Sequence, residues 1–175
     1  MNKQERAIVR LSKIAYKEMK KVRPTLAGGN LNDVDDTIIT TGYWMFVDKN
    51  KDDTQLEGFI KSQERIFLNW KQLIKEQTKT SLKVNIDFKT RFKTYPTEMF
   101  DEKTEIVKIG DDWYNLKQVN MLLDCFVKPD IYAEYMYSSS NARALYIKEY
   151  NKIAVILPLH PNAIKQWEQW KKENE

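Results

Sequence analysis

The hydrophobic and polar positions between residues 113 and 159 predict one short helix followed by three strands. Asn115 can cap the helix together with Gln118, three places further on, and Pro129 is expected to end it. Cys125 falls on the apolar side of this segment. The apolar residues expected to share one buried helical face are Leu116, Val119, Leu123 and Phe126.

Three strands are expected to follow this helix. Residues 131–137 and 143–148 are rich in aromatic and branched side chains, and a polar Ser/Asn turn at 138–141 joins them. A second turn at 149–152 leads into the apolar strand 153–157. Because both connections are short, we expect these strands to pair as an antiparallel meander.

Further strands are expected in the middle of the chain. Residues 37–47 combine Ile, Thr and aromatic side chains, with Gly42 expected to mark a bend or bulge within one strand. Residues 82–89 alternate strictly between apolar and polar side chains, which predicts a half-buried strand. Residues 105–109 predict one more strand, followed by a turn at 110–112.

A long helix is expected near the N-terminus. Asn2 and Glu5 can form a capping box, and strong helix formers continue to Val22, just before Pro24. Its apolar residues recur at helical spacing: Ile8, Leu11, Ala15, Met19 and Val22. We therefore expect one face of this helix to be buried.

Two more helical segments are expected. Residues 55–77 approximate a helical period, and Thr54 with Glu57 can cap them, so one or two helices are predicted there. Residues 163–172 predict a C-terminal amphipathic helix whose apolar face carries Ile164, Trp167 and Trp170. This face can dock on its own domain, which we favour, or contact another subunit or partner.

The first helix also carries a stripe of cations. They recur at the same spacing as its apolar residues but on another face: Lys3, Arg6, Arg10, Lys13, Lys17 and Lys20. Like charges three or four residues apart repel each other, so a compensating anion is expected. A nucleic-acid backbone would supply it through sequence-independent phosphate contacts. The alternative is a solvated face whose carboxylate partners come from elsewhere in the fold.

Composition and charge limit the class of protein. The chain has 175 residues, 42% of them hydrophobic, and a formal net charge of +4, which fits one folded domain. Cys125 is the only cysteine, so no intramolecular disulfide is expected. The charged N-terminus is not typical of a signal peptide, and no apolar run is long enough to cross a bilayer. We therefore expect a cytoplasmic protein that does not enter a membrane.

Few residues suit catalysis or metal binding. One histidine, His160, and one cysteine do not make a nucleophilic triad or a zinc site, and His160 is expected to be structural. The acidic cluster Asp33, Asp35 and Asp36 lacks the glycine and the distal glutamate of a calcium loop. Residues 28–29 are a Gly-Gly turn and not a phosphate-binding loop. We expect no catalytic residue, metal or cofactor.

One enzymatic alternative remains, a magnesium-dependent nuclease. Asp130 and Glu134, at the start of a predicted strand, could hold a hard cation near a phosphate. The lysine expected after the glutamate of such a site is replaced by Tyr135 and Met136. This alternative is therefore remote.

Four short motifs in their order along the chain carry a family resemblance. They are RPTL at residues 23–26, TTGYWM at 40–45, VNMLLD at 119–124 and VILPLH at 155–160. This order resembles one repeat of the bacterial DNA polymerase sliding clamp, the β-clamp. The resemblance implies an α+β clamp-like (DNA clamp) fold with two helices packed on antiparallel sheets. Residues 50–79 have no counterpart in the family's pattern and are expected to be an inserted helical segment.

The resemblance also implies functional surfaces. In the clamp family the helices present basic side chains to DNA, which would assign phosphate contacts to the stripe of the first helix. Partner proteins of the family dock a short peptide beside the terminal strand, which would assign partner binding to Leu157, Pro158 and Leu159. A single repeat would close a ring only as a homo-oligomer.

The sequence thus predicts one clamp-like domain over residues 1–160 and an appended helix over 161–175. Its expected function is that of a non-enzymatic, DNA-associated processivity or replication accessory factor, encoded by a bacterium or by its phages or plasmids. Replication or repair proteins are the expected protein partners. The alternative is a monomeric adaptor or regulator of replication that keeps the fold without encircling DNA.

Overall fold

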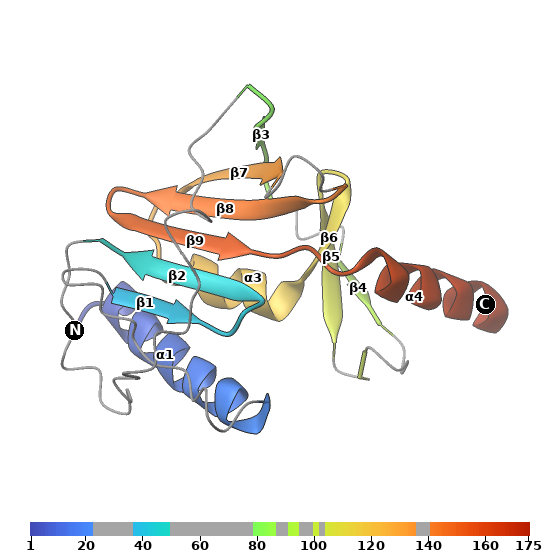
Figure 1. Ribbon diagram of the computed structural model, residues 1–175, viewed down its shortest axis with the longest axis horizontal. Coiled ribbons are helices and arrows are strands. Elements are labelled where there is room, and N and C mark those ends of the chain that lie inside the picture. The colour runs from blue at the N-terminus through green and yellow to red at the C-terminus, as the bar shows by residue number, and fades with distance from the viewer. Residues whose placement is uncertain (23–36, 50–78, 87–90, 95–99, 102–103, 136–140) are drawn as a thin grey trace.

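A computed structural model describes residues 1–22, 37–49, 79–86, 91–94, 100–101, 104–135 and 141–175. The described strands form two antiparallel sheets (Figure 1). The larger sheet has the order β1-β2-β9-β8-β7-β3 and the smaller one the order β4-β5-β6. The fold is therefore α+β with antiparallel sheets, as the sequence predicts.

The larger sheet joins the β1–β2 hairpin to the β8–β9 hairpin, followed by β7 and the edge strand β3. Its register pairs Trp44 with Ile156 and Asp48 with Lys152, so the β1–β2 and β8–β9 turns lie at opposite ends of the sheet (Figure 1). Its strands are β1 (Thr37–Thr40), β2 (Trp44–Asp48), β3 (Leu82–Lys83), β7 (Asp130–Tyr135), β8 (Arg143–Glu149) and β9 (Lys152–Ile156).

The smaller sheet is tied to the larger one by polar contacts. Its strands are β4 (Arg91–Lys93), β5 (Glu105–Ile109) and β6 (Asp112–Asn115). The hydroxyl of Tyr114 donates a hydrogen bond to the carbonyl of Arg143 at 2.6 Å, and the carboxylate of Asp112 accepts one from the Arg143 N–H at 3.0 Å. Burial raises the pKa of the Tyr114 hydroxyl, and Asp112 raises it further, so the hydroxyl remains a donor.

Three helices are described: α1 (Lys3–Val22), α3 (Leu116–Leu123) and α4 (Pro161–Asn174). The predicted capping box of α1 is confirmed, because the Asn2 N–H donates to the Glu5 carboxylate and the Glu5 N–H donates to the Asn2 side chain, both at 2.8 Å. The Asn115 side chain caps α3 by accepting from the Gln118 N–H at 3.2 Å. These contacts satisfy N–H groups that a helix leaves without partners at its first turn.

The main core lies where α1 and α3 cover one face of the larger sheet. From α1 it receives Ala7, Ile8, Leu11 and Ala15, and from α3 it receives Leu116, Val119 and Leu122. Every second side chain of a strand points to this face of the sheet, and Phe46, Leu145 and Ile147 are among those that pack against the helices. Val107, Ile109 and Tyr114 extend the same core into the smaller sheet. Burial of so many apolar side chains is the main stabilising term.

The opposite face of the larger sheet is also buried. Met45, Val47, Tyr132, Tyr146 and Val155 form a second cluster there, with the Tyr132 and Tyr146 rings stacked 5.2 Å apart. Burial on both faces explains why β2, β8 and β9 read as nearly continuous apolar runs.

Two strand predictions are corrected. Residues 37–47 do not form one bent strand, because the chain reverses at Gly42, which has a φ of 91°, and makes the β1–β2 hairpin. Of the alternating segment 82–89, the structure describes residues 82–86, in which Leu82 and Lys83 form β3 and one further hydrogen bond runs from the Val84 N–H to the Ile131 carbonyl. Regular pairing with β7 thus covers Leu82 and Lys83, opposite Ala133 and Tyr132.

The α3 prediction is corrected at its C-terminal end. The helix ends at Leu123 rather than at Pro129, because the Cys125 and Phe126 N–H groups turn back onto the Leu122 and Leu123 carbonyls. Leu122 is fully buried where Leu123 was expected, and Leu123 only packs against the core from its edge. Phe126 and Cys125 are buried as predicted.

Several predictions lie outside the described residues. They are the helical segment 55–77, the acidic cluster Asp33, Asp35 and Asp36, the glycine pair 28–29 and the turn residues 138–140. The side chains of Met19, Lys20 and Val22 are likewise outside the described part of α1. The inserted segment therefore stays a prediction.

Candidate nucleic-acid interface

Helix α1 presents the predicted stripe to solvent. The side chains of its described members are exposed: Lys3, Arg6, Arg10, Lys13 and Lys17. Ile8, Leu11 and Ala15 face the sheet and are almost completely buried. Because the apolar side of the helix is fixed against the core, the cations are held on the outer surface of the protein.

No described carboxylate lies within 4.0 Å of the stripe cations Lys3, Arg6, Arg10, Lys13 and Lys17. Glu5 is used by the capping box and lies 4.0 Å from the N-terminal ammonium. Within the described residues, the alternative of a stripe neutralised by carboxylates from elsewhere in the fold therefore finds no support.

Helix α3 lies beside α1 and carries an exposed cation, Lys117, in its first turn. Burial raises the pKa of Glu18 on α1, and the ammonium of Lys117 on α3 opposes this rise, which places these two side chains near each other. Phe126, just beyond the other end of α3, shares the main core with Ala7 and Ile8. The two helices run antiparallel (Figure 1), and Lys117, which is exposed, lies near Glu18. Asp124 is the exposed acid of this helix end.

The predicted partner residues occupy the segment that joins the two sheets. The Leu157 N–H donates to the Tyr43 carbonyl at 3.0 Å and the Leu159 N–H to the Trp113 carbonyl at 2.8 Å. Leu157 packs on the second sheet face, whereas Leu159 packs on the cluster under α4. Leu157, Pro158 and Leu159 are each half-buried. The side chains of Leu157 and Leu159 thus pack in two different intramolecular clusters, and Tyr43, which is 65% exposed, lies beside Leu157.

The carboxylates of the nuclease alternative do not converge. Asp130 and Glu134 are four residues apart on β7, so their side chains are separated by about 13 Å. Glu134 is buried and accepts hydrogen bonds from the Thr80 hydroxyl at 2.8 Å and the Ser81 hydroxyl at 2.6 Å. Asp130 is exposed, with Lys83 at 3.9 Å. Among the described residues, no group of three metal-ligating side chains is suited to a cation.

The histidine and the cysteine have structural positions. Nδ1 of His160 accepts a hydrogen bond from the Asn162 N–H at 3.2 Å and so caps α4, ahead of Pro161 at the first turn. Cys125 is fully buried, and burial raises the pKa of its thiol to about 12, although Lys152 opposes the shift. A thiol with this pKa carries almost no thiolate at neutral pH.

Helix α4 docks on the smaller sheet, which agrees with the interpretation favoured from the sequence. Ala163, Ile164 and Trp167 are buried against Phe100 and Ile106. The Trp167 ring also meets Phe92 and Trp113, with centroid separations of 5.9 and 5.5 Å. Trp170, predicted on the same face, is only partly buried.

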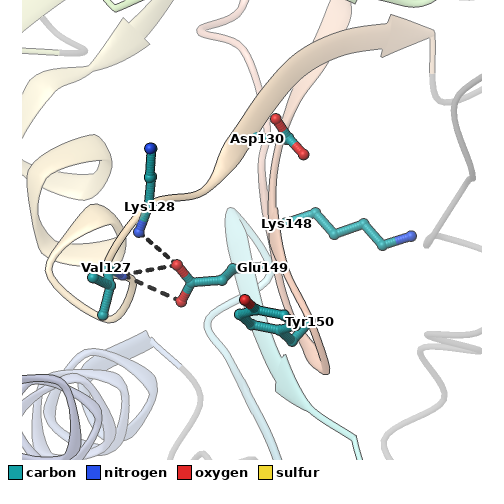
Figure 2. Close-up of a pocket in the computed structure, with 6 residues that line it drawn as sticks. All are labelled: Val127, Lys128, Asp130, Lys148, Glu149 and Tyr150. Atoms are coloured by element: carbon teal, nitrogen blue, oxygen red, sulfur yellow. Dashed lines mark hydrogen bonds between the residues drawn. The ribbon is translucent and has the colours of Figure 1, made fainter.

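A surface hollow at the β8–β9 turn was not indicated by the sequence pattern. Its lining residues are Val127, Lys128, Asp130, Lys148, Glu149 and Tyr150 (Figure 2). The local sequence feature that marks this region is Tyr150, a bulky residue between the polar residues Glu149 and Asn151 in the predicted turn. The hollow itself depends on a loop and a hairpin that are distant in sequence.

Comparison of the chain with protein-family models, with curated proteins and with solved structures finds no match. None of the helices in the described residues combines the length and the apolar character needed to cross a membrane. What the described elements define is a class: an α+β protein whose larger antiparallel sheet carries two antiparallel helices on one face.

Proposed function

We propose that this protein is a non-enzymatic, clamp-like, DNA-associated accessory factor of replication that contacts DNA phosphates through α1. The observation that carries the proposal is the exposed row of cations from Lys3 to Lys17, held outward by the buried face of the same helix. Cations that no described carboxylate neutralises can release counterions from a nucleic acid and so gain affinity.

The arrangement of the elements supports the clamp-like part of the proposal. Helices α1 and α3 pack on one face of an antiparallel sheet, and the motif resemblance implies two helices packed on antiparallel sheets. Both helices carry exposed cations, the stripe from Lys3 to Lys17 on α1 and Lys117 on α3.

Encirclement of DNA would require several copies of this chain. One protomer supplies one such helix pair, so a ring needs repeated head-to-tail contacts with a closing rotation. Light scattering of the native particle, with and without duplex DNA at low salt, measures this directly. A closed oligomer supports encirclement, whereas a monomer under both conditions favours the adaptor form of the proposal.

The phosphate contact is tested by charge reversal on the stripe. The variant Arg6→Glu/Arg10→Glu/Lys13→Glu should abolish binding of a labelled duplex in fluorescence anisotropy at low salt. For the unaltered protein, log Kd plotted against log salt should have a slope of about 4.5, from about 0.9 for each of five duplex phosphate contacts. A slope near zero would contradict the proposal.

A matched control carries the same change of charge at exposed positions away from the stripe. Lys93, Lys165 and Lys172 are exposed and belong to β4 and α4. Their combined change to Glu lowers the net charge equally, so a loss of binding in both variants would indicate an effect of net charge alone. Binding retained only in the control assigns the contact to α1.

The second candidate is a monomeric protein-binding adaptor or regulator of replication. It draws on Leu157, Pro158 and Leu159, which lie half-buried beside the exposed Tyr43. A pull-down from cell extract with the unaltered protein and with the Leu157→Ser/Leu159→Ser variant tests this site. Circular dichroism shows whether the variant is folded. Undiminished capture by a folded variant removes the site from the proposal.

A further inference from the structure

The turn between β8 and β9 presents an aromatic ring at an energetic cost. Tyr150 has a φ of 50°, in the left-handed region that bulky residues rarely adopt, and it is 94% exposed. A ring with so little contact to the protein cannot offset that backbone cost by burial. Glycine or asparagine would suit this position better, so the ring itself calls for an explanation.

A neighbouring loop is fixed against this turn. The Glu149 carboxylate accepts hydrogen bonds from the Val127 N–H, at 3.1 Å to Oε1 and 3.2 Å to Oε2, and from the Lys128 N–H (Figure 2). Lys152 lies 3.8 Å from the same carboxylate and donates to the Cys125 carbonyl at 3.1 Å. Glu149 and Lys152 therefore connect the loop at 125–128 to the β8–β9 hairpin. A hollow of about 660 Å³ lies between the loop and the hairpin.

The surface of the hollow combines apolar and cationic groups. Val127 is 73% exposed and lies beside the Tyr150 turn, whereas Lys128 and Lys148 extend to opposite sides of the hollow (Figure 2). The acids of the lining have cationic neighbours, since Glu149 is close to Lys152 and Asp130 lies 3.9 Å from Lys83. Lys128 and Lys148 therefore leave the hollow with an excess of positive charge, complementary to an anionic ligand.

The hollow lies next to the N-terminal half of α1. Phe126, which precedes the loop, belongs to the same buried cluster as Ala7 and Ile8. Figure 1 places the start of α1 and the β8–β9 turn at the same end of the sheet, and in Figure 2 the α1 ribbon passes near Val127. The start of the α1 stripe and the hollow thus lie toward the same end of the larger sheet.

We propose that the Tyr150 turn is a stacking site for an unpaired base of single-stranded nucleic acid, with Lys128 and Lys148 contacting the adjoining phosphates. This inference rests on the proposed function, because it extends the backbone contact of α1. Proteins that bind single strands combine a cationic track with exposed aromatic rings, since every base offers a flat face for stacking. A paired base inside a duplex has no free face to offer, so the site selects the unpaired form.

The test compares two substitutions of Tyr150 on two ligands. Fluorescence anisotropy at low salt measures binding of a labelled oligothymidine and of a duplex of equal length. Tyr150→Ala should weaken oligothymidine binding about tenfold, the loss expected for one stacked base, and should leave duplex binding within about twofold. Tyr150→Phe keeps the ring and should bind like the unaltered protein.

Two further variants test whether a loss of binding comes from misfolding or from the removal of any exposed tyrosine. Tyr150→Gly also removes the ring but suits the left-handed backbone, so its loss of binding cannot come from misfolding. Tyr43 is 65% exposed in the β1–β2 turn at the opposite end of the sheet, and Tyr43→Ala should change neither affinity. A loss in Tyr43→Ala equal to that in Tyr150→Ala would overturn the assignment.

The outcomes separate this inference from the proposed function. Unchanged oligothymidine binding in Tyr150→Ala, with binding still abolished by the stripe variant, overturns the stacking site alone and leaves the exposed ring to a protein partner. Equal losses on oligothymidine and duplex overturn it as well, because the turn would then contact only phosphates. If the unaltered protein binds neither ligand, both proposals are wrong.

Discussion

Trp113 of β6 and Trp167 of α4 meet edge to face, with their ring centroids 5.5 Å apart and their planes inclined by 62°. Trp167 is only 4% exposed, and the Lys171 ammonium lies 5.7 Å from its ring. An edge-to-face aromatic pair contributes about 1 kcal/mol beyond the burial of its area. This contact attaches the C-terminal helix to the smaller sheet.

Trp167→Ala should therefore destabilise the protein by about 3–5 kcal/mol, the usual cost of removing a buried tryptophan side chain. Urea unfolding followed by circular dichroism measures the change. Trp170→Ala, on the partly exposed side of the same helix, should cost about 1 kcal/mol or less. Similar losses in the two variants would show that α4 does not dock through Trp167.

Glu149→Gln should destabilise the protein because it removes the charged acceptor shared by the Val127 and Lys128 N–H groups. Hydrogen bonds to a charged group contribute about 1.5–3 kcal/mol, so a loss of that order is expected in urea unfolding. Glu168 is exposed on α4, and Glu168→Gln serves as the control with little change. An unaltered stability in Glu149→Gln would mean that the loop does not depend on this carboxylate.

Tyr150→Gly should raise the free energy of unfolding by about 1 kcal/mol, because glycine adopts a positive φ without steric cost. Thermal unfolding measures the effect, with Tyr150→Ala as the comparison that removes the ring but keeps a Cβ. Only the glycine variant should gain stability. A loss of stability in Tyr150→Gly would show that the ring stabilises the fold after all.

Glu18 should make stability depend on pH. Its pKa is raised by burial, so the folded protein binds this proton more tightly than the unfolded chain does. Stability from this group is therefore present at acidic pH and is lost as the pH rises through the raised pKa. Glu18→Gln should stabilise the protein at neutral pH, and this gain should disappear at a pH below the ordinary pKa of a glutamate.

Lys117 provides an independent measurement of the same contact. Its ammonium lowers the pKa of Glu18 against the effect of burial, so Lys117→Gln should raise that pKa further. A carboxyl NMR titration of both proteins gives the two values. Equal pKa values would mean that α1 and α3 do not bring these side chains together in solution.

Local sequence determined the elements whose stabilising contacts lie within a few residues. The capping pairs of Asn2 with Glu5 and of Asn115 with Gln118 join residues three apart, and strand 105–109 begins and ends as predicted. The outward direction of the stripe from Lys3 to Lys17 also follows from helical periodicity once the apolar face is buried. These features need no knowledge of the rest of the chain.

Tertiary structure decided what depends on partners distant in sequence. The alternation at 82–89 predicts a strand, but the partner of the described β3 is β7, which lies far along the chain. The β1–β2 hairpin pairs with the equally distant β9, and the hollow beside Tyr150 depends on Glu149 reaching a loop that precedes it by more than 20 residues. Sequence periodicity reports which side of an element is buried, whereas strand length and the meeting of loops are set by long-range pairing, which periodicity does not encode.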